Sequence, residues 1–285
     1  MPSIHTLVPD VYQLLKEKGW KNVLHVEDLS NRLRSQVSSS EGEREPTLRL
    51  SQMGDRCPRA LWYSIHNPEM AEPLPPWAIF KYEYGHVIEA LALTLAKAAG
   101  HQVEGEQDEL VLLGIKGHRD AVIDGCLVDV KSTNSFTMAK ARKGVFEESD
   151  SFGYLDQLDG YVSASANDSL VLEKDKGYLW FIDKQLGHMH VYEHQVRSER
   201  IISRIQSYKQ IVEGRAPPTC TCGTRAIGSS GNIELDVRAS YSAFKFCCNP
   251  TIRTFLYSDG PKFFTRVGRL PDVPEIDREG QIIYR

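Results

Sequence analysis

The sequence predicts an α/β fold in which a mixed central sheet is flanked by helices. In the segment 77–100, Val87, Leu91 and Leu95 recur at helical spacing. From about residue 108 to residue 133 the apolar residues change to the period of strands. Helical patterns return after this stretch, and an alternation of helical and strand periods is typical of α/β domains.

Further elements are expected along the rest of the chain. Helices are predicted at 9–19, 26–37, 57–66, 151–166 and 199–214, and a second hairpin at 177–194. A polar linker at 38–46 follows the first two helices, of which the first ends at Gly19. We therefore expect an N-terminal helical segment (1–47), a core (48–215) and a loop-rich C-terminal region (216–285).

The composition excludes few classes of protein. The 285 residues suffice for one large domain or two smaller ones, and the net charge of −4 argues against a generally basic nucleic-acid coat. No apolar run approaches the roughly 18 residues of a membrane span. The first residues lack the regions of a secretory signal, so a cytoplasmic protein without a membrane partner is expected. Its six cysteines should then be reduced or bound to metal.

Two carboxylates and a lysine are expected on one face of the hairpin near residue 125. Asp124-Gly125 favours a two-residue turn, and that register places Asp120 opposite Asp129. Cross-strand partners have Cβ atoms only about 5 Å apart, and like charges there are destabilising. Lys131 is two residues beyond Asp129, so it belongs to the same face.

A hard divalent cation would offset the repulsion between these carboxylates. Mg²⁺ takes carboxylate oxygens and keeps several waters, and such an ion activates water and neutralises charge on a phosphate. A lysine alongside can orient or deprotonate the water, or stabilise the developing negative charge. The alternative is a solvated hairpin face on which Lys131 forms a salt bridge with Asp120 or Asp129.

The pattern D-x(8)-D-x-K, formed by Asp120, Asp129 and Lys131, resembles the core motif of the PD-(D/E)XK nuclease superfamily. Upstream, "YGHVIEAL" is similar to the helix motif of RecB-like nucleases, with Glu89 as its acid. Downstream, "DQLDGY" is similar to their Gln-x-x-x-Tyr motif, whose two side chains share a helix face. The fold expected is therefore a PD-(D/E)XK core with a helical N-terminal and a loop-rich C-terminal addition.

The whole chain looks like phage exonucleases of this superfamily, which are related to the CRISPR-associated RecB-like exonucleases. The stretches "LRLSQMGDRCPRALWY", "FGYLDQLDGY" and "LYSDGPKFFTRV" support this resemblance. It implies a Mg²⁺- or Mn²⁺-dependent deoxyribonuclease, with DNA as its partner, acting in recombination or in the processing of DNA ends. If the protein is phage-encoded, its location is the host cytoplasm.

The resemblance also implies roles for individual residues. The metal ligands would be Glu89, Asp120, Asp129 and the backbone carbonyl of Val130. Lys131 would be the catalytic lysine. Gln157 and Tyr161 would position the DNA or that lysine.

Many RecB-like exonucleases carry an iron–sulfur cluster on one early and three late cysteines, and Cys57 looks like the early ligand. The late region departs from the pattern, because Ala239 and Ser242 stand where a Cys-x-x-Cys pair is usual. Cys248 matches, with Cys247 beside it. Cys220 and Cys222 could join Cys57 and either Cys247 or Cys248 in a 4Fe–4S site. A zinc site stays open as an alternative, as does a set of reduced structural thiols left by the loss of the cluster.

Other functions stay open at the level of sequence. One alternative is a sequence- or structure-specific endonuclease of the same superfamily, which would cleave with the same residues. The other is a non-catalytic protein that binds nucleic acid on its surface without cleaving it. A recombination or replication protein is a further partner to consider. The sequence decides neither the polarity of digestion, nor the preference for single or double strands, nor the oligomeric state.

Overall fold

The computed structural model describes residues 2–17, 23–39, 45–54 and 56–284. The predicted helix stop at Gly19 and residues 40–44 of the predicted linker lie outside these residues. Contacts divide the chain into two units. Unit 1 comprises Met1–Gly54 and Pro75–Ile205, and unit 2 comprises Asp55–Leu74 and Gln206–Arg285. The domain boundaries that the sequence suggests, at residues 47 and 215, remain a prediction, whereas the two units are defined by contacts.

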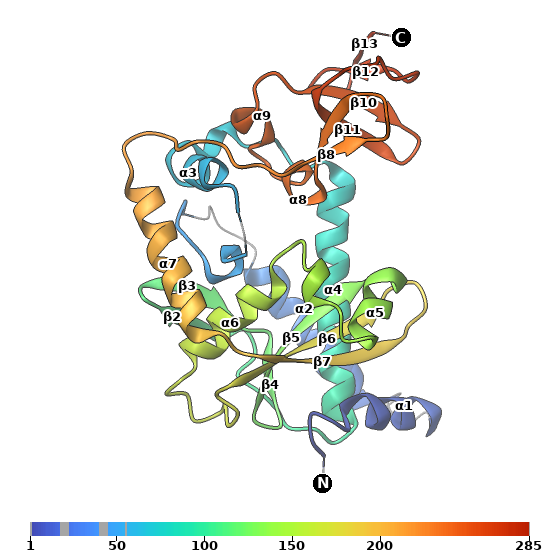
Figure 1. Ribbon diagram of the computed structural model, residues 1–285. Coiled ribbons are helices and arrows are strands. Elements are labelled where there is room, and N and C mark those ends of the chain that lie inside the picture. Colours follow the sequence, from blue (N-terminus) through green and yellow to red (C-terminus); the bar gives the residue numbers. More distant parts are fainter. Residues whose placement is uncertain (1, 18–22, 40–44, 55, 285) are drawn as a thin grey trace. The chain divides into compact units, whose positions relative to one another are not determined.

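Unit 1 contains a five-stranded sheet, a separate two-stranded hairpin and most of the helices (Figure 1). Its helices are α1 (Leu7–Glu17), α2 (Val23–Ser39), α4 (Pro76–Ala98), α5 (Ser135–Arg142) and α6 (Tyr154–Ala164). Its strands are β1 (Val103–Glu104), β2 (Glu109–Leu112), β3 (Ile115–His118), β4 (Ala121–Ile123), β5 (Cys126–Thr133), β6 (Lys176–Asp183) and β7 (Met189–Gln195). Helix α7 (Ser198–Glu213) begins in unit 1 and ends in unit 2.

The five-stranded sheet has the order β1-β4-β5-β6-β7. Strands β5 and β6 are parallel, and the other neighbouring pairs are antiparallel. The predicted mixed sheet between helices is therefore confirmed, as are the strand-rich stretch near residue 120 and the hairpin of β6 and β7. β2 and β3 form their own antiparallel hairpin.

The β4–β5 hairpin has the predicted register, with Ala121 opposite Val128 and Ile123 opposite Cys126. Asp124 and Gly125 both have positive φ values, 52° and 81°, as a type I′ turn requires. A Cβ at Gly125 would also lie 2.7 Å from the Leu172 side chain, but that side chain is exposed and can move, so the turn favours glycine chiefly for its conformation. The dipeptide alone was sufficient to predict this turn.

The alternation of side chains along β5 gives the sheet two different faces. One face packs against α4 and α1 through the buried residues Leu7, Val11, Ile88, Ala92, Leu95, Cys126, Val128, Val130, Tyr178 and Trp180. The other face carries Asp129 and Lys131 and is covered by α6, which buries Leu155 and Leu158. The polar residues of the hairpin therefore lie under α6.

Helix α1 belongs to the core of unit 1. Leu7 and Val11 are fully buried, and the Tyr12 hydroxyl accepts a hydrogen bond from the backbone N–H of Met189 at 2.8 Å. The sequence predicted a helical addition here, but the apolar side of the helix completes the cover of the sheet. No helix within the described ranges is long and apolar enough to cross a bilayer.

Unit 2 is built around a six-stranded antiparallel sheet, so the prediction of a loop-rich C-terminal region is wrong. The order of the strands is β13-β12-β10-β11-β9-β8 (Figure 1). They are β8 (Thr224–Ile227), β9 (Asn232–Leu235), β10 (Arg253–Tyr257), β11 (Gly260–Arg266), β12 (Glu275–Ile276) and β13 (Ile282–Tyr284). β12 and β13 are too short to show a period of two, and buried and exposed side chains do not alternate strictly along β8, β9, β10 and β11, which is why the sequence did not reveal the sheet. Buried Phe255 and Phe264 pack edge to face at its centre.

Among the described residues of unit 2 there are also three short α-helices. They are α3 (Pro58–His66), α8 (Val237–Ser240) and α9 (Lys245–Cys248). α3 was expected, and it packs against α9. The Trp62 indole N–H donates to the carbonyl of Gly214 at 2.7 Å, which ties α3 to the end of α7.

Candidate active site and cysteine cluster

The predicted site residues come from helix α4, the β4–β5 hairpin and helix α6 of unit 1. Glu89 lies on α4, Asp120 immediately precedes β4, and three residues lie on β5: Asp129, Val130 and Lys131. Gln157 and Tyr161 lie one turn apart on α6. Hydrogen bonds, an ion pair and electrostatic interactions link all of these elements, so the structure brings the predicted residues together.

Asp129 and Lys131 form a close ion pair. Nζ of Lys131 lies 2.6 Å from Oδ2 of Asp129. The carboxylate is 1% exposed and the lysine side chain 18% exposed, so the pair is largely removed from water. The Lys131 ammonium also lies 4.9 Å from the centre of the Tyr154 ring, a cation–π contact. Tyr154 was not predicted as part of the site.

Gln157 connects Asp129 to Tyr161. Its Nε2 donates to Oδ1 of Asp129 at 3.2 Å and to the Tyr161 hydroxyl at 2.9 Å. Tyr161 is buried at 3% exposure, so its hydroxyl is a fixed acceptor. The helical spacing of four residues, which suggested a common face, therefore corresponds to a direct hydrogen bond.

Asp120 is held by the neighbouring strand. The backbone N–H of Val130 donates to its Oδ2 at 2.7 Å. The hairpin ladder ends at Ala121 and Val128, so the predicted pairing of Asp120 with Asp129 lies one step beyond the paired residues. The carboxylate of Asp120 therefore contacts the backbone of β5 between Asp129 and Lys131.

Glu89 is oriented by Gln107, which the sequence analysis missed. Nε2 of Gln107 donates to Oε1 of Glu89 at 2.8 Å, and the backbone N–H of Gln107 donates to the carbonyl of Asp120 at 3.4 Å. Gln107 has a φ of 56°, a left-handed conformation that few residues other than glycine adopt. No spacing rule points to a glutamine in this turn, so only the folded chain reveals it.

Burial raises the pKa of all three carboxyls, and the charge of Asp129 adds to this effect at Asp120 and Glu89. Burial raises the pKa of Asp120 well above its usual range, and the charges of Asp129 and Glu89 raise it further. Burial and the charge of Asp129 also raise the pKa of Glu89. For Asp129, burial raises the pKa and the Lys131 ammonium offsets part of the effect. The site therefore holds more negative charge than its single lysine neutralises.

Lys131 is correspondingly held in its charged form. Burial alone would lower the pKa of its ammonium, but the carboxylates of Asp129 and Asp120 outweigh burial and raise the pKa above its usual range. In this arrangement Lys131 is a permanent positive charge at neutral pH. It is suited to stabilising negative charge rather than to accepting a proton.

Helix α6 is anchored by two other aspartates of the "DQLDGY" stretch. Asp156 pairs with Arg204 at 2.5 Å. Asp159 is fully buried, accepts from Nε2 of His194 at 2.7 Å and also accepts from the backbone N–H of Arg197 at 3.0 Å. These pairs fix the helix that carries Gln157, so their role is to position α6.

The donor set fits a hard divalent cation. Three carboxylates face one ammonium, and oxygen ligands with excess negative charge are what Mg²⁺ and Mn²⁺ select. Oδ2 of Asp129 is buried, and among the described residues it accepts no hydrogen bond of regular geometry; its contact is the Lys131 ammonium. An ion bound at this oxygen would share it with the Lys131 ammonium, or replace that ammonium, and would give up no other hydrogen bond.

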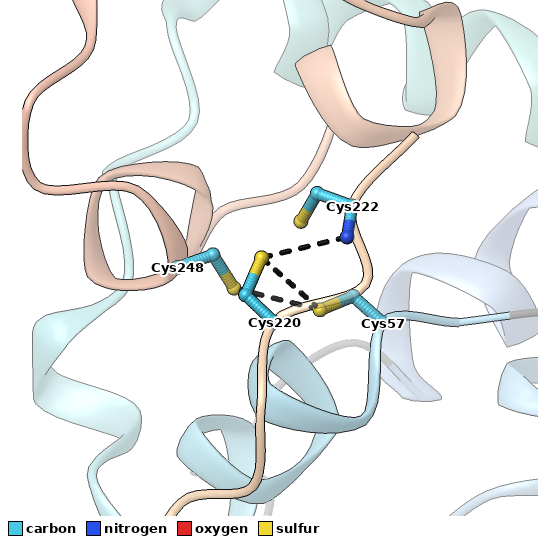
Figure 2. Close-up of side chains that lie close together, drawn as sticks. All are labelled: Cys57, Cys220, Cys222 and Cys248. Carbon is cyan, nitrogen blue, oxygen red and sulfur yellow. Dashed lines mark hydrogen bonds between the residues drawn. The ribbon is translucent and has the colours of Figure 1, made fainter. Parts of the chain in front are cut away.

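A second group of predicted residues gathers in unit 2. The Sγ atoms of Cys57, Cys220, Cys222 and Cys248 all lie within 4.8 Å of one another (Figure 2). The Sγ of Cys57 is 3.9 Å from that of Cys220 and 3.8 Å from that of Cys248. Cys247 is outside the group, since its Sγ contacts the carbonyl of Met70 at 3.7 Å. We call these four residues the cysteine cluster.

Backbone groups and helix ends surround the cysteine cluster. Cys57 is the N-cap of α3, and Cys248 ends α9. Hydrogen bonds from the thiols of Cys222 and Cys248 lower the pKa of Cys57, although its burial opposes this. The same contacts raise the pKa of Cys248. Without a cation the cluster therefore favours a single thiolate, at Cys57. Four thiolates so close together require a bound cation.

Comparisons with known proteins add little to what these residues indicate about function. The chain matches no protein-family model, and no curated protein is significantly similar to it in sequence. It is similar to the crystal structure of SSO0001, with a TM-score of 0.40 and 16% identity over 80% of this chain and 97% of the other. It is also similar to an alkaline exonuclease from Laribacter hongkongensis, with a TM-score of 0.37 and 14% identity over 60% of this chain and 89% of the other. Similarity this low carries no conclusion about activity, so the function has to be argued from the residues of this chain.

Proposed function

We propose that this chain is a Mg²⁺- or Mn²⁺-dependent deoxyribonuclease that hydrolyses phosphodiester bonds from DNA ends. One observation carries the proposal: three carboxylates from α4 and the β4–β5 hairpin lie beside a largely buried, charged lysine, where burial raises the pKa of each carboxyl and the charge of Asp129 raises the pKa of Asp120 and Glu89 further. An arrangement of this kind is destabilising without a cation, so its presence in a folded core favours a functional role.

The metal would be held by Glu89, Asp120, Asp129 and the backbone carbonyl of Val130. When bound, the ion would neutralise charge on the scissile phosphate and lower the pKa of a coordinated water. Gln157 keeps Asp129 in place, and Gln107 keeps Glu89 in place. These amides act as positioning residues, because they fix the carboxylates before any ion binds.

Lys131 would supply a fixed positive charge to the phosphate. Its ammonium is paired with Asp129 and braced against the Tyr154 ring. From this position it would stabilise the negative charge that develops on the phosphate oxygens, and it would orient the attacking water through a hydrogen bond.

DNA and exonucleolytic cleavage are proposed because of the order of the motifs. Glu89 lies on helix α4, Asp120 and Asp129-x-Lys131 lie on or beside the β4–β5 hairpin, and Gln157 and Tyr161 lie on helix α6. This order resembles the pattern of the RecB-like phage exonucleases. Such an enzyme would act in recombination, repair or the processing of DNA ends. A recombination or replication protein would be its natural partner.

The proposal is tested by digestion of end-labelled linear DNA and of a covalently closed circle. Each substrate is incubated with Mg²⁺, with Mn²⁺ or with EDTA, using the wild-type chain and Lys131→Ala. We expect the linear DNA alone to be degraded, only with a divalent cation, and not by the variant. Lys97→Ala is a matched control, because Lys97 is exposed and pairs with Asp28 away from the site.

Each other outcome has a definite meaning. Cleavage of the closed circle would replace the exonuclease by an endonuclease. Full activity of Lys131→Ala would remove the hairpin from the chemistry. No cleavage with either metal would leave nucleic-acid binding as the function of the site.

A further inference from the structure

We propose that the cysteine cluster binds a single Zn²⁺ ion in a closed tetrahedral site, and not a 4Fe–4S cluster. The proposal is independent of the nuclease activity, because Cys57, Cys220, Cys222 and Cys248 all belong to unit 2 and the residues of the active site to unit 1. It rests on the separations of the sulfur atoms, on the backbone around them and on the chain segments that they connect.

The separations of the sulfur atoms fit a single ion. Zn–S bonds of about 2.3 Å at the corners of a tetrahedron place the sulfurs about 3.8 Å apart. The Sγ of Cys57 lies 3.8 Å from that of Cys248 and 3.9 Å from that of Cys220, and no pair in the cluster exceeds 4.8 Å. The four side chains are thus already arranged as the ligands of one cation.

The same separations do not fit a 4Fe–4S cluster. In that cluster each thiolate binds a different iron, so the whole cube of iron and sulfide lies between the four cysteines. Sulfurs 3.8–3.9 Å apart touch one another and leave no space for the cube. The residues that the family resemblance suggested as cluster ligands therefore favour another metal.

The chain around the sulfurs holds them in place. The backbone N–H groups of Thr221 and Cys222 donate to the sulfurs of Cys57 and Cys220, each at 3.4 Å. Such N–H···S bonds stabilise thiolates and orient metal ligands. Figure 2 shows the four side chains converging from three separate segments of the ribbon.

The loop with Cys220 and Cys222 is fixed on both sides. Before it, Nε of Arg59 donates to the carbonyl of Pro218 at 2.7 Å. After it, Gly223 packs so closely that a Cβ would lie 1.9 Å from the Asp236 carboxylate, and its carbonyl accepts from the Asp236 N–H at 2.9 Å. A loop that is fixed in this way loses little entropy when the ion binds.

The cluster connects parts of the chain that are far apart in sequence. Cys57 is separated from Cys220 by 163 positions and from Cys248 by 191. Four thiolate ligands leave no open position for substrate, which is typical of structural rather than catalytic zinc. The ion would therefore join the segment Asp55–Leu74 to the C-terminal part of unit 2.

Metal analysis of the full chain tests the proposal. The protein is purified without oxygen, and zinc, iron and acid-labile sulfide are measured together with the visible spectrum. We expect one zinc per chain, no sulfide and no visible absorption. After the zinc is exchanged for Co²⁺, the strong visible bands of a tetrahedral thiolate site should appear with a stoichiometry of one.

Cysteine variants locate the ion. Cys57→Ser and Cys248→Ser should each lose the zinc, whereas Cys247→Ser should keep it, although Cys247 is adjacent to Cys248. If the first two variants do not fold, Co²⁺ binding by the wild-type chain still decides the outcome. Equal amounts of iron and sulfide, one iron without sulfide, disulfides among the four cysteines, or absence of any metal would each overturn the zinc assignment.

Discussion

Asp129 is the residue on which the contacts of the candidate active site converge. It pairs with Lys131, accepts a hydrogen bond from Gln157 and raises the pKa of Asp120 and Glu89 by its charge. A buried carboxylate in such surroundings costs stability in the metal-free protein. The residues that can bind a cation therefore lower the stability of the metal-free protein.

The raised pKa of Asp120 predicts how stability depends on pH. In metal-free protein the folded state keeps the Asp120 proton at pH values where the unfolded state, with a pKa of about 3.9, has lost it. Stability therefore falls as pH rises from about 4 through the raised folded pKa. In Asp120→Asn part of this loss of stability with rising pH should disappear. At pH 7 the free energy of unfolding of the variant should exceed that of the wild type by about 0.5–2 kcal/mol.

Urea unfolding at several pH values, in buffer without divalent cations, measures this effect. The relevant transition is the one that Mg²⁺ shifts in the wild-type chain. With Mg²⁺ present the wild type should be more stable than Asp120→Asn, because the amide is a poorer ligand than the carboxylate. Identical pH profiles for the wild type and Asp120→Asn would show that Asp120 is not repelled by its neighbours.

Tyr161 tests whether the helix residues position the carboxylate. Tyr161→Phe removes the hydroxyl that accepts from Gln157 and leaves that amide held by Asp129 alone. Since the supporting partners of metal ligands typically contribute 10- to 100-fold, we expect cleavage to slow by about 10-fold and Mg²⁺ to bind more weakly. Tyr12→Phe, which removes a hydroxyl on α1, is the control. An unchanged rate in Tyr161→Phe would exclude a positioning role.

At the scale of elements, local signals predicted most of unit 1. The long apolar helix α4, the Asp124-Gly125 turn and the spacing of Gln157 and Tyr161 are each encoded within a few residues, so they could be identified from the sequence. Gln107 and Tyr154 join the site through the fold, and no short pattern marks them.

The C-terminal sheet was missed for a related reason. Its strands span two to seven residues, and β12 and β13 consist of only two and three. Segments this short show no reliable period, and their pairing depends on contacts between distant parts of the chain. The four cysteines were identified by residue type, but only the fold shows which of the pair Cys247 and Cys248 joins the cluster.

Helix α6 depends on a close approach of two glycines. Gly153, which precedes the helix, has a φ of 74°, and a Cβ there would lie 2.3 Å from Cα of Gly54. Gly153→Ala should therefore destabilise unit 1 by about 2–4 kcal/mol, because backbone atoms must move. Gly144→Ala is the matched control: its φ is 71°, but the added Cβ meets nothing within 4 Å, so about 1 kcal/mol is expected. Equal losses in urea unfolding would show that the approach of the glycines is not needed.

At the scale of the whole molecule, the two units would depend on two different metals. Mg²⁺ binds oxygen ligands and should stabilise unit 1, whereas zinc binds thiolates and should stabilise unit 2. Thermal unfolding should therefore show Mg²⁺ raising one transition, while Cys57→Ser lowers the other and leaves the Mg²⁺ effect intact. Loss of the Mg²⁺ effect in Cys57→Ser would contradict the assignment of the two sites to separate units.

The initial rate of nucleotide release from end-labelled linear DNA, measured across Mg²⁺ concentrations for the wild type and Asp129→Asn, tests the central claim most directly. The account predicts a rate that rises with Mg²⁺ and saturates in the wild type, and that is at least about 100-fold lower in Asp129→Asn. The control Asp272→Asn, which changes an exposed carboxyl of unit 2, should match the wild type. A rate in Asp129→Asn equal to that of the wild type would contradict the assignment of the β5 carboxylate to the active site.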